Sequence, residues 1–179
     1  MIDGKDLASF DVKEYRKEIN IIVQKPSLFE GTLLSNISPG EKRIHQIGIL
    51  RQDLIDLGFP LSKLQDTDLG YEIKEGGSNL SQSEKQIICL MQALQKDSKI
   101  VILDEATAYV DINLEKKFQE RLYSKFKNST MLIISHRLSN VKDVDRVLVF
   151  DKGRIVEDGN PRELMKNEKG VFSGLLGRE

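Results

Sequence analysis

Ile100-Val101-Ile102-Leu103-Asp104-Glu105 is the stretch on which the fold of this chain depends. Four consecutive apolar residues are typical of a strand that is buried on both faces in the middle of a parallel sheet. Two carboxylates follow where the strand should end, and open α/β sheets bind their ligands at the carboxyl ends of strands. One carboxylate there can serve a metal ion and the other a water molecule, although a plain polar turn has the same pattern.

The composition restricts the class of protein. The 179 residues suffice for one domain with a core, and 27 basic against 28 acidic side chains leave a formal net charge of -1. This balance argues against a nucleic-acid-binding protein that relies on a uniform positive field. The single Cys89 excludes an internal disulfide and favours a reduced, intracellular setting. Because no apolar run is long enough to span a membrane, we expect any membrane link to come through a partner.

Strands and helices alternate along the chain, which predicts an α/β fold with a mainly parallel sheet. Apolar, largely β-branched runs predict strands at 19–23, 99–103 and 130–134. A helix is predicted over 111–126 from apolar residues spaced by four, and a hairpin over 146–156.

Two further segments carry local signals. Ser81 and Glu84 form an S-x-x-E capping box, which predicts the start of a helix. The segment from about Ser38 to Gly76 has a helical apolar stripe over 41–58 and no clear strand. We interpret it as an inserted, mainly helical subdomain.

Polar side chains follow several of these elements, and their order and spacing resemble the nucleotide-binding domain of ATP-binding-cassette (ABC) transporters. The resemblance covers essentially the whole chain and is closest to exporters, in particular to the multidrug-resistance-associated subfamily. It rests on ordered motifs, any one of which alone would be a weak signal. The matching segments are Val23-Gln24-Lys25-Pro26, Leu28-Phe29-Glu30-Gly31-Thr32, Asn36-Ile37, Gly77-Ser78-Asn79-Leu80-Ser81, Ile100 to Thr107, Ala108-Tyr109-Val110-Asp111 and Ile134-Ser135-His136-Arg137-Leu138.

The resemblance implies ATP and Mg²⁺ as ligands and assigns roles to four residues near the predicted strand ends. Gln24 matches the Q-loop glutamine, which touches the magnesium ion and the attacking water. Asp104 matches the Walker B aspartate, which supports the magnesium ion, usually through water. Glu105 matches the catalytic carboxylate, and His136 the switch histidine that bonds the γ-phosphate. These roles fit phosphoryl transfer, which needs positioning and charge neutralisation more than covalent chemistry.

Two more residues match positions that face a second nucleotide-binding domain. Asp111 matches the D-loop aspartate, and Ser81 matches the serine of the signature motif. Each candidate also has a structural explanation: Asp111 as a helix cap, Gln24 as a polar strand end and His136 as a loop histidine. Leu28 and Phe29 match the loop that faces the coupling helices of the membrane domains, unless both pack inside the domain.

The chain departs from the family in two places. No G-x-x-x-x-G-K-[ST] motif occurs in the 179 residues, so the amides and lysine that cradle phosphates have no counterpart. We expect a sheet without that strand to have an interior gap and uncovered apolar surface. The signature motif L-S-G-G-Q is replaced by Leu80-Ser81-Gln82-Ser83-Glu84. Glu84 should stabilise the helix start and oppose a triphosphate across a dimer interface.

The resemblance thus predicts a P-loop NTPase-like sheet with flanking helices and a helical insertion, lacking the P-loop strand and helix. We divide this partial domain into a core with the Q-loop (1–37), a mainly helical subdomain (38–80), the signature helix (81–94) and a core with Walker B, D-loop and H-loop (95–179). Its expected place is the cytoplasmic face of a membrane, bound through transmembrane partners.

The predicted function is the coupling of ATP binding and hydrolysis to export, with little ATPase activity from this chain alone. The expected partners are a second nucleotide-binding domain and the transmembrane domains of an exporter, and no nucleic acid. One alternative is a non-catalytic module that pairs with a complete ABC ATPase subunit. Another is an ABC ATPase of DNA maintenance, which the exporter-like loop and the balanced charge disfavour.

Overall fold

The computed structural model describes residues 2, 4–9, 11–39, 47–107, 112–135, 141 and 143–176. The chain divides into two compact units, Met1–Ile134 and Ser135–Glu179. Each unit has a hydrophobic cluster of its own. In the part of the chain that the structure describes, no helix is both long and apolar enough to cross a membrane.

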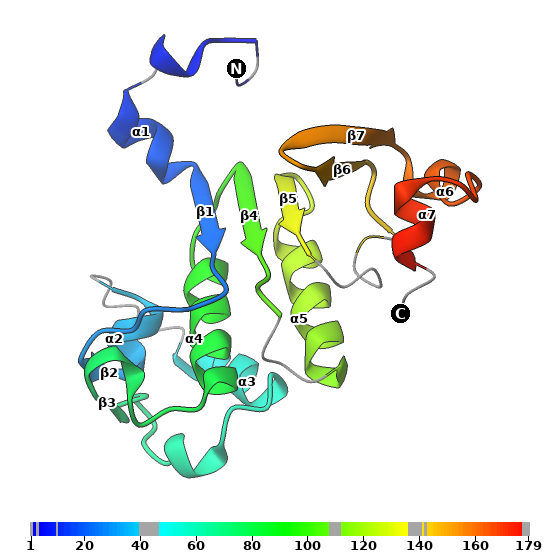
Figure 1. Ribbon diagram of the computed structural model, residues 1–179. Helices are drawn as coiled ribbons and strands as arrows, with labels where there is room; N and C mark the ends of the chain where they lie inside the picture. Colours follow the sequence, from blue (N-terminus) through cyan, green and yellow to red (C-terminus); the bar gives the residue numbers. More distant parts are fainter. Residues whose placement is uncertain are drawn as a thin grey trace. The chain divides into compact units, whose positions relative to one another are not determined.

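The first unit is built on a parallel sheet of three strands in the order β1-β4-β5 (Figure 1). Strand β1 spans Ile19–Ile22, β4 spans Ile100–Asp104 and β5 spans Thr130–Ile134. The three strands run in register, with Ile22 beside Leu103. The predicted parallel sheet is therefore confirmed, and the expected interior gap does not lie between these three strands.

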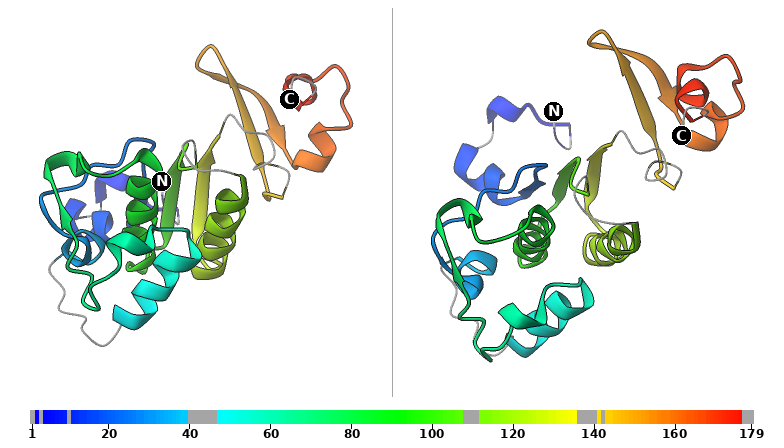
Figure 2. Two further views of the ribbon diagram at one scale, coloured as in Figure 1. Left: turned by 90° about the horizontal axis from the view of Figure 1, so that it is seen from below. Right: turned by 60° about the horizontal axis from the view of Figure 1, so that its bottom comes forward.

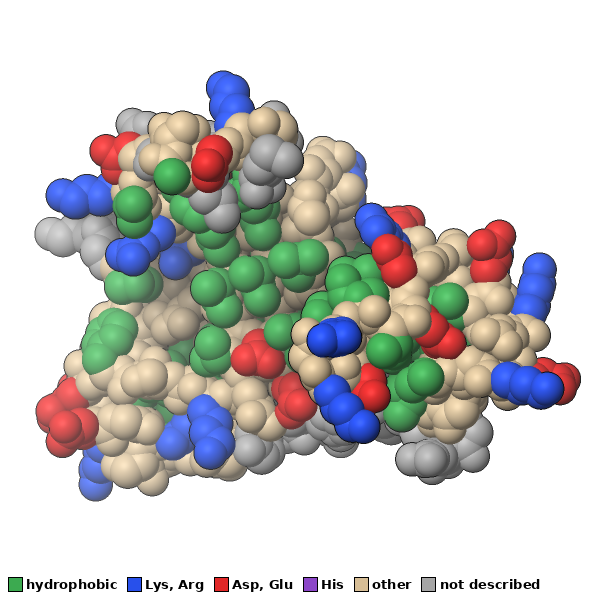
Figure 3. All heavy atoms as spheres, turned by 45° about the horizontal axis from the view of Figure 1, so that its top comes forward, with side chains coloured by type: hydrophobic (Ala, Val, Ile, Leu, Met, Phe, Trp, Pro, Cys, Tyr) green, Lys and Arg blue, Asp and Glu red, His purple; other side chains and the backbone are tan. Residues whose placement is uncertain are grey.

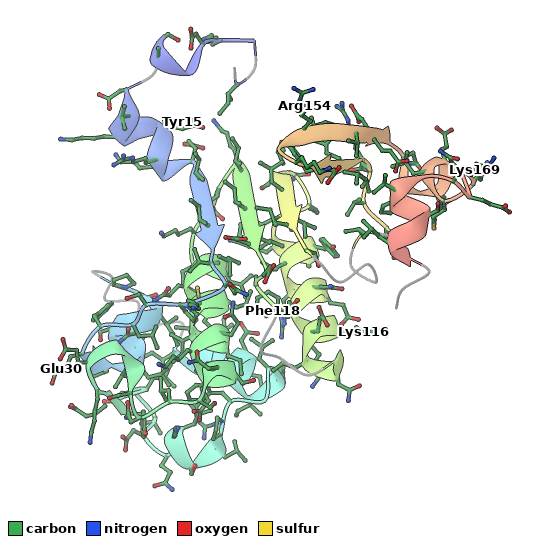
Figure 4. All side chains as sticks on the ribbon, in the orientation of Figure 1. Tyr15, Glu30, Lys116, Phe118, Arg154 and Lys169 are labelled. Atoms are coloured by element: carbon green, nitrogen blue, oxygen red, sulfur yellow. The ribbon has the colours of Figure 1, made fainter. Side chains whose placement is uncertain are left out.

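Two helices cover one face of this sheet: α4 (Gln82–Leu94) and α5 (Ile112–Lys125) lie side by side beneath it (Figure 2). Val101 and Leu103 project into the core on this side, and Phe118 of α5 is fully buried in the same cluster. Figure 4 shows Phe118 on the inner side of α5, whereas Lys116 of the same helix points outward. The helical spacing of the apolar residues thus directs one side of α5 to the sheet.

The opposite face of the sheet carries exposed apolar side chains. Ile21, Leu132 and Ile134 are 54%, 52% and 56% exposed, and hydrophobic side chains gather in this region in Figure 3. The prediction that the strand at 100–103 is buried on both faces is wrong: Ile100 and Ile102 are only half-buried, because α4 and α5 pack on one face only. The expected uncovered apolar surface is present.

The rest of the first unit consists of short elements that precede α4 in the chain, and the one that holds Asp53 and Asp56 contacts α5 through Arg121. The predicted insertion holds one strand that sequence reasoning missed, β3, which pairs with β2 in antiparallel orientation. Leu64, Leu69 and Ile73 of this segment are buried in the core of the unit. The elements are η1 (Leu7–Ser9), α1 (Val12–Lys17), β2 (Gly31–Thr32), α2 (Leu33–Ile37), α3 (Ile47–Asp56), η3 (Leu61–Lys63), β3 (Glu72–Ile73) and η4 (Glu75–Gly77).

The second unit is the predicted hairpin followed by two short helices. Val149 and Phe172 form its buried hydrophobic cluster. Lys152 and Gly153 both have positive φ (47° and 77°), as a tight hairpin turn requires. Asn160 caps the helix that Pro161 begins, because its side chain accepts from the backbone amide of Arg162. The elements are β6 (Val147–Asp151), β7 (Arg154–Gly159), α6 (Pro161–Leu164) and α7 (Val171–Leu176).

Candidate functional site

The ends of β1 and β4 bring two predicted site residues into direct contact. The Nε2 atom of Gln24 donates a hydrogen bond to Oε2 of Glu105 at 2.6 Å. The two residues are 81 positions apart in the sequence, and they meet because parallel strands in register end at the same edge of the sheet. Gln24 is neutral, so this contact orients the carboxylate without cancelling its charge.

The backbone of Glu105 is held in an unusual conformation. Its φ is 47°, in the left-handed region that residues other than glycine seldom adopt. The amide of Glu105 donates to the carbonyl oxygen of Ile134 at 3.0 Å, which fixes this residue to the end of β5. Strained backbone of this kind concentrates at functional sites, and here it turns the side chain of Glu105 toward Gln24.

Two amide side chains fix β1, and with it Gln24, to helix α4. Buried Asn20 donates from Nδ2 to the carbonyl oxygen of Ala93 at 2.9 Å. Gln86, which is fully buried, donates from Nε2 to the carbonyl oxygen of Val23 at 3.4 Å. These bonds attach β1 and Val23, the residue before Gln24, to α4.

Asp104 is the last residue of β4, and its side chain is exposed. The oxygens of Asp104, Glu105 and Gln24 are of the kind that Mg²⁺ prefers. Within the described residues no group of three or more His, Cys, Asp or Glu side chains is placed to hold a metal ion. Mg²⁺ commonly takes one or two protein ligands and completes its shell with phosphate and water, so this donor set fits the family's magnesium ion.

Asp111 and His136 lie outside the described residues, and their roles stay predictions. Thr107, two residues after Glu105, is tied to α5, because its hydroxyl donates to Oε1 of buried Glu115 at 2.6 Å. Ser135 is half-buried just beyond the end of β5.

A second group of polar residues forms around Ser81 at the start of α4. The predicted capping box is confirmed: Ser81 Oγ accepts from the amide of Glu84 at 3.2 Å, and the amide of Ser81 donates to Glu84 Oε2 at 2.6 Å. Two backbone amides at this helix end, those of Ser81 and Glu84, thus have side-chain partners. None of the described contacts of this group involves Gln24, Asp104 or Glu105.

Lys63, from the predicted helical subdomain, joins this second group and was missed by sequence reasoning. Its Nζ atom lies 2.6 Å from Glu84 Oε1, with the two side chains 20% and 10% exposed. The same atom donates to the carbonyl oxygen of Asn79 at 3.3 Å. It also lies 5.5 Å from the ring centroid of Tyr71. Lys63 and Glu84 are 21 positions apart, so no local sequence pattern predicts that they form a pair.

The carboxyl of Glu84 stays ionised in this setting. Burial pushes its pKa upward, but hydrogen bonds from Lys63 and from the backbone and side chain of Ser81 outweigh burial, so the pKa lies below its usual value. The negative charge that the sequence places beside Ser81 is therefore real, and it is matched by a cation in direct contact.

The loop after Gln24 is held by one buried amide. Asn36 accepts from the backbone amide of Phe29 at 3.1 Å and donates to its carbonyl oxygen at 3.0 Å. Leu28 packs into the core and is only 4% exposed, whereas Phe29 is 46% exposed. Of the two residues predicted to face a partner, the structure therefore leaves Phe29 on the surface, on a loop with a fixed backbone.

The comparisons with known proteins agree with this geometry. The family model described as "ABC transporter" matches residues 1–108. The chain belongs to the ABC transporter family. The fold agrees with it as well: a solved structure of a bacterial Atm1-family ABC exporter with ATP bound has a TM-score of 0.86 and 27% sequence identity. That likeness covers 99% of this chain and 31% of the exporter chain.

Two curated relatives in the ABC family are multidrug or sub-family C proteins. The pleiotropic ABC efflux transporter of multiple drugs YBT1 of Candida glabrata is 36% identical over 97% of this chain. ATP-binding cassette sub-family C member 2 of Rattus norvegicus is 40% identical over 100% of it. The chain spans 12% of the first relative's length and 11% of the second's.

Proposed function

We propose that this chain is a nucleotide-binding domain that couples ATP binding and hydrolysis to export across a membrane. The observation that carries the proposal is the contact between Gln24 and Glu105, at the strand ends where the family performs its chemistry. The efflux transporter among its relatives and the ATP-bound exporter with the same fold support the reaction class.

In this proposal Glu105 polarises the water that attacks the γ-phosphate of ATP. Gln24 holds the carboxylate by its 2.6 Å hydrogen bond and contacts the attacking water. His136 donates a hydrogen bond to a γ-phosphate oxygen, as a neutral or protonated imidazole can. A magnesium ion supported by Asp104 and Gln24 would neutralise charge on the phosphates. The protein's own contribution is positioning and electrostatic stabilisation.

The proposed partners follow from the surfaces that carry the remaining candidates. Ser81 and Asp111 would face the ATP bound by a second nucleotide-binding domain. Phe29, exposed on a loop that Asn36 fixes, would contact the transmembrane domains. This arrangement places the chain at the cytoplasmic face of a membrane, and no contact with nucleic acid is proposed.

The test of this proposal is ATP turnover by the intact transporter that contains this chain, in proteoliposomes. Replacing Glu105 by glutamine keeps the shape of the side chain and removes its charge. Since loss of a general base typically costs 10²–10⁴-fold, we expect turnover to fall by about 100-fold or more. A variant that turns over ATP at the wild-type rate would contradict the proposal. The matched control is Glu120→Gln on the exposed side of α5.

We also propose that the 179-residue chain, assayed alone, binds little ATP, because it contains no phosphate-loop motif. Calorimetric titration with millimolar Mg-ATP tests this, and clear micromolar binding would refute it. In the alternative, a non-catalytic module that pairs with a complete ABC subunit, Glu105→Gln would leave the turnover of the assembly unchanged while the chain still co-purifies with that subunit.

A further inference from the structure

Glu84 places a negative charge at the start of the signature helix, where a phosphate is proposed to bind. A carboxylate at the third position of the helix favours the helix dipole, yet it lies beside Ser81, the residue proposed to meet a triphosphate. An unmatched negative charge there would repel phosphate. The structure holds a cation, Lys63, 2.6 Å from that carboxylate.

The hydroxyl of Ser81 is in contact with both the backbone amide and the carboxylate of Glu84. Ser81 Oγ accepts from the amide of Glu84, and the O–H of Ser81 donates to the carboxylate of Glu84. The amide of Ser81 is occupied by Glu84 Oε2. Any phosphate at this helix end would therefore meet the hydroxyl of exposed Ser81, next to a carboxylate whose charge only Lys63 balances among the contacts described for it.

Lys63 also fixes the segment that leads into Ser81. Its Nζ donates to the carbonyl oxygen of Asn79. Asn79 in turn accepts from the backbone amide of Lys74 at 3.0 Å and donates to the carbonyl oxygen of Glu72 at 2.8 Å. One side chain from η3 thus holds both the residue that precedes the signature motif and the carboxylate within it.

We infer that Lys63 is a positioning residue for the proposed ATPase reaction: it neutralises Glu84 and holds Asn79, so that Ser81 can receive the phosphates of an ATP bound by the opposite domain. The substituted signature sequence remains compatible with a triphosphate only while this cation is in place. The inference rests on the proposed function, and Lys63 acts through Glu84 without touching the nucleotide.

The test measures KM for ATP and kcat of the intact transporter with four proteins: wild type, Lys63→Met, Glu84→Gln and the double variant. Loss of Lys63 should raise KM at least tenfold where Glu84 is present, with a smaller change in kcat. Where Glu84 is already glutamine, loss of Lys63 should change KM by less than threefold. Lys63→Arg, which can still pair with a carboxylate, should restore KM to within threefold of wild type.

The matched control is Lys85→Met, which removes an equal charge from the residue that follows Glu84 in α4. The Nζ of Lys85 donates to the carbonyl oxygen of Gly76 at 2.9 Å and not to Glu84. KM should change by less than threefold in this variant. If Lys63→Met does not give folded protein, Lys63→Gln replaces it, both with Glu84 and with Glu84→Gln. The same changes in KM are then expected.

A KM of the Lys63 variant within threefold of wild type would overturn the inference. An equal rise in KM with and without Glu84 would also overturn it, because Lys63 would then contact the nucleotide or only support the fold. Failure of the proposed function looks different, since Glu105→Gln would then turn over ATP at the wild-type rate.

Discussion

Two carboxylates in this chain, those of Glu84 and Glu105, lie at the ends of regular elements. They differ in their hydrogen-bond partners and in their backbone conformation. Glu84, at the start of α4, has one oxygen on the amide of Ser81 and the other on Lys63. Glu105, after β4, receives a 2.6 Å hydrogen bond from a neutral amide, that of Gln24. Glu84 has a relaxed capping geometry, whereas Glu105 has a left-handed backbone.

The difference separates a structural carboxylate from a candidate catalytic one. The contacts of Glu84 use both carboxylate oxygens and include a cation. They stabilise the folded state and leave neither oxygen without a partner. A hydrogen bond from a neutral donor to a strained residue orients a charge and does not neutralise it, which is what a general base requires. We therefore expect substitutions at Glu84 to change mainly stability and those at Glu105 to change mainly turnover.

The largest effect on stability should come from Glu84→Ala. This change removes the acceptor for the amide of Ser81 and leaves Lys63, only 20% exposed, without its carboxylate. Losing a partner of a largely buried charged group typically costs about 1–3 kcal/mol. Urea unfolding of the 179-residue chain measures the free energy of unfolding. An unchanged value would show that the pair adds nothing to stability.

The share of stability from Glu84 should depend on pH. Its pKa in the folded chain lies below the ordinary value of 4.5, mainly because Lys63 and Ser81 offset the cost of burial. The contribution is therefore fully present above pH 4.5 and is lost as the pH falls through the folded pKa. The difference in unfolding free energy between wild type and Glu84→Gln should be constant near neutral pH and shrink as the pH falls below 4.5. A constant difference throughout would contradict this.

The smallest effect on stability should come from Glu105→Gln. The glutamine is isosteric, its oxygen can still accept from Gln24, and the backbone bond to Ile134 is unaffected. The free energy of unfolding should change by no more than about 0.5 kcal/mol, as for most substitutions that break no special contact. A loss as large as that for Glu84→Ala would remove the distinction between the two carboxylates.

Much of the fold could be predicted because its signals are local. β-branched runs indicated the strands, and Ser81 with Glu84, three residues apart, indicated the helix start. The meeting of Gln24 with Glu105 also followed, since parallel strands deliver their polar ends to one edge. The contact of Lys63 with Glu84 had no such signal, because it joins two segments that only tertiary packing brings together.

The face of the sheet was harder to predict than the strands themselves. An apolar run such as Ile100–Leu103 does not predict whether one face of the strand or both faces are covered. Leu132 and Ile134 are in fact more than half exposed. The two residues of the candidate site that the structure does not describe, Asp111 and His136, keep the roles implied by the family as predictions.

The central claim is that Gln24 and Glu105 act as one unit in ATP hydrolysis, and a double-mutant cycle on the intact transporter tests it most directly. ATP turnover is measured for Gln24→Ala, Glu105→Gln and the double variant. Residues that act as a unit are strongly non-additive, so we predict that the double variant is no more than about threefold slower than Glu105→Gln alone. Two losses that multiply in the double variant would contradict the account.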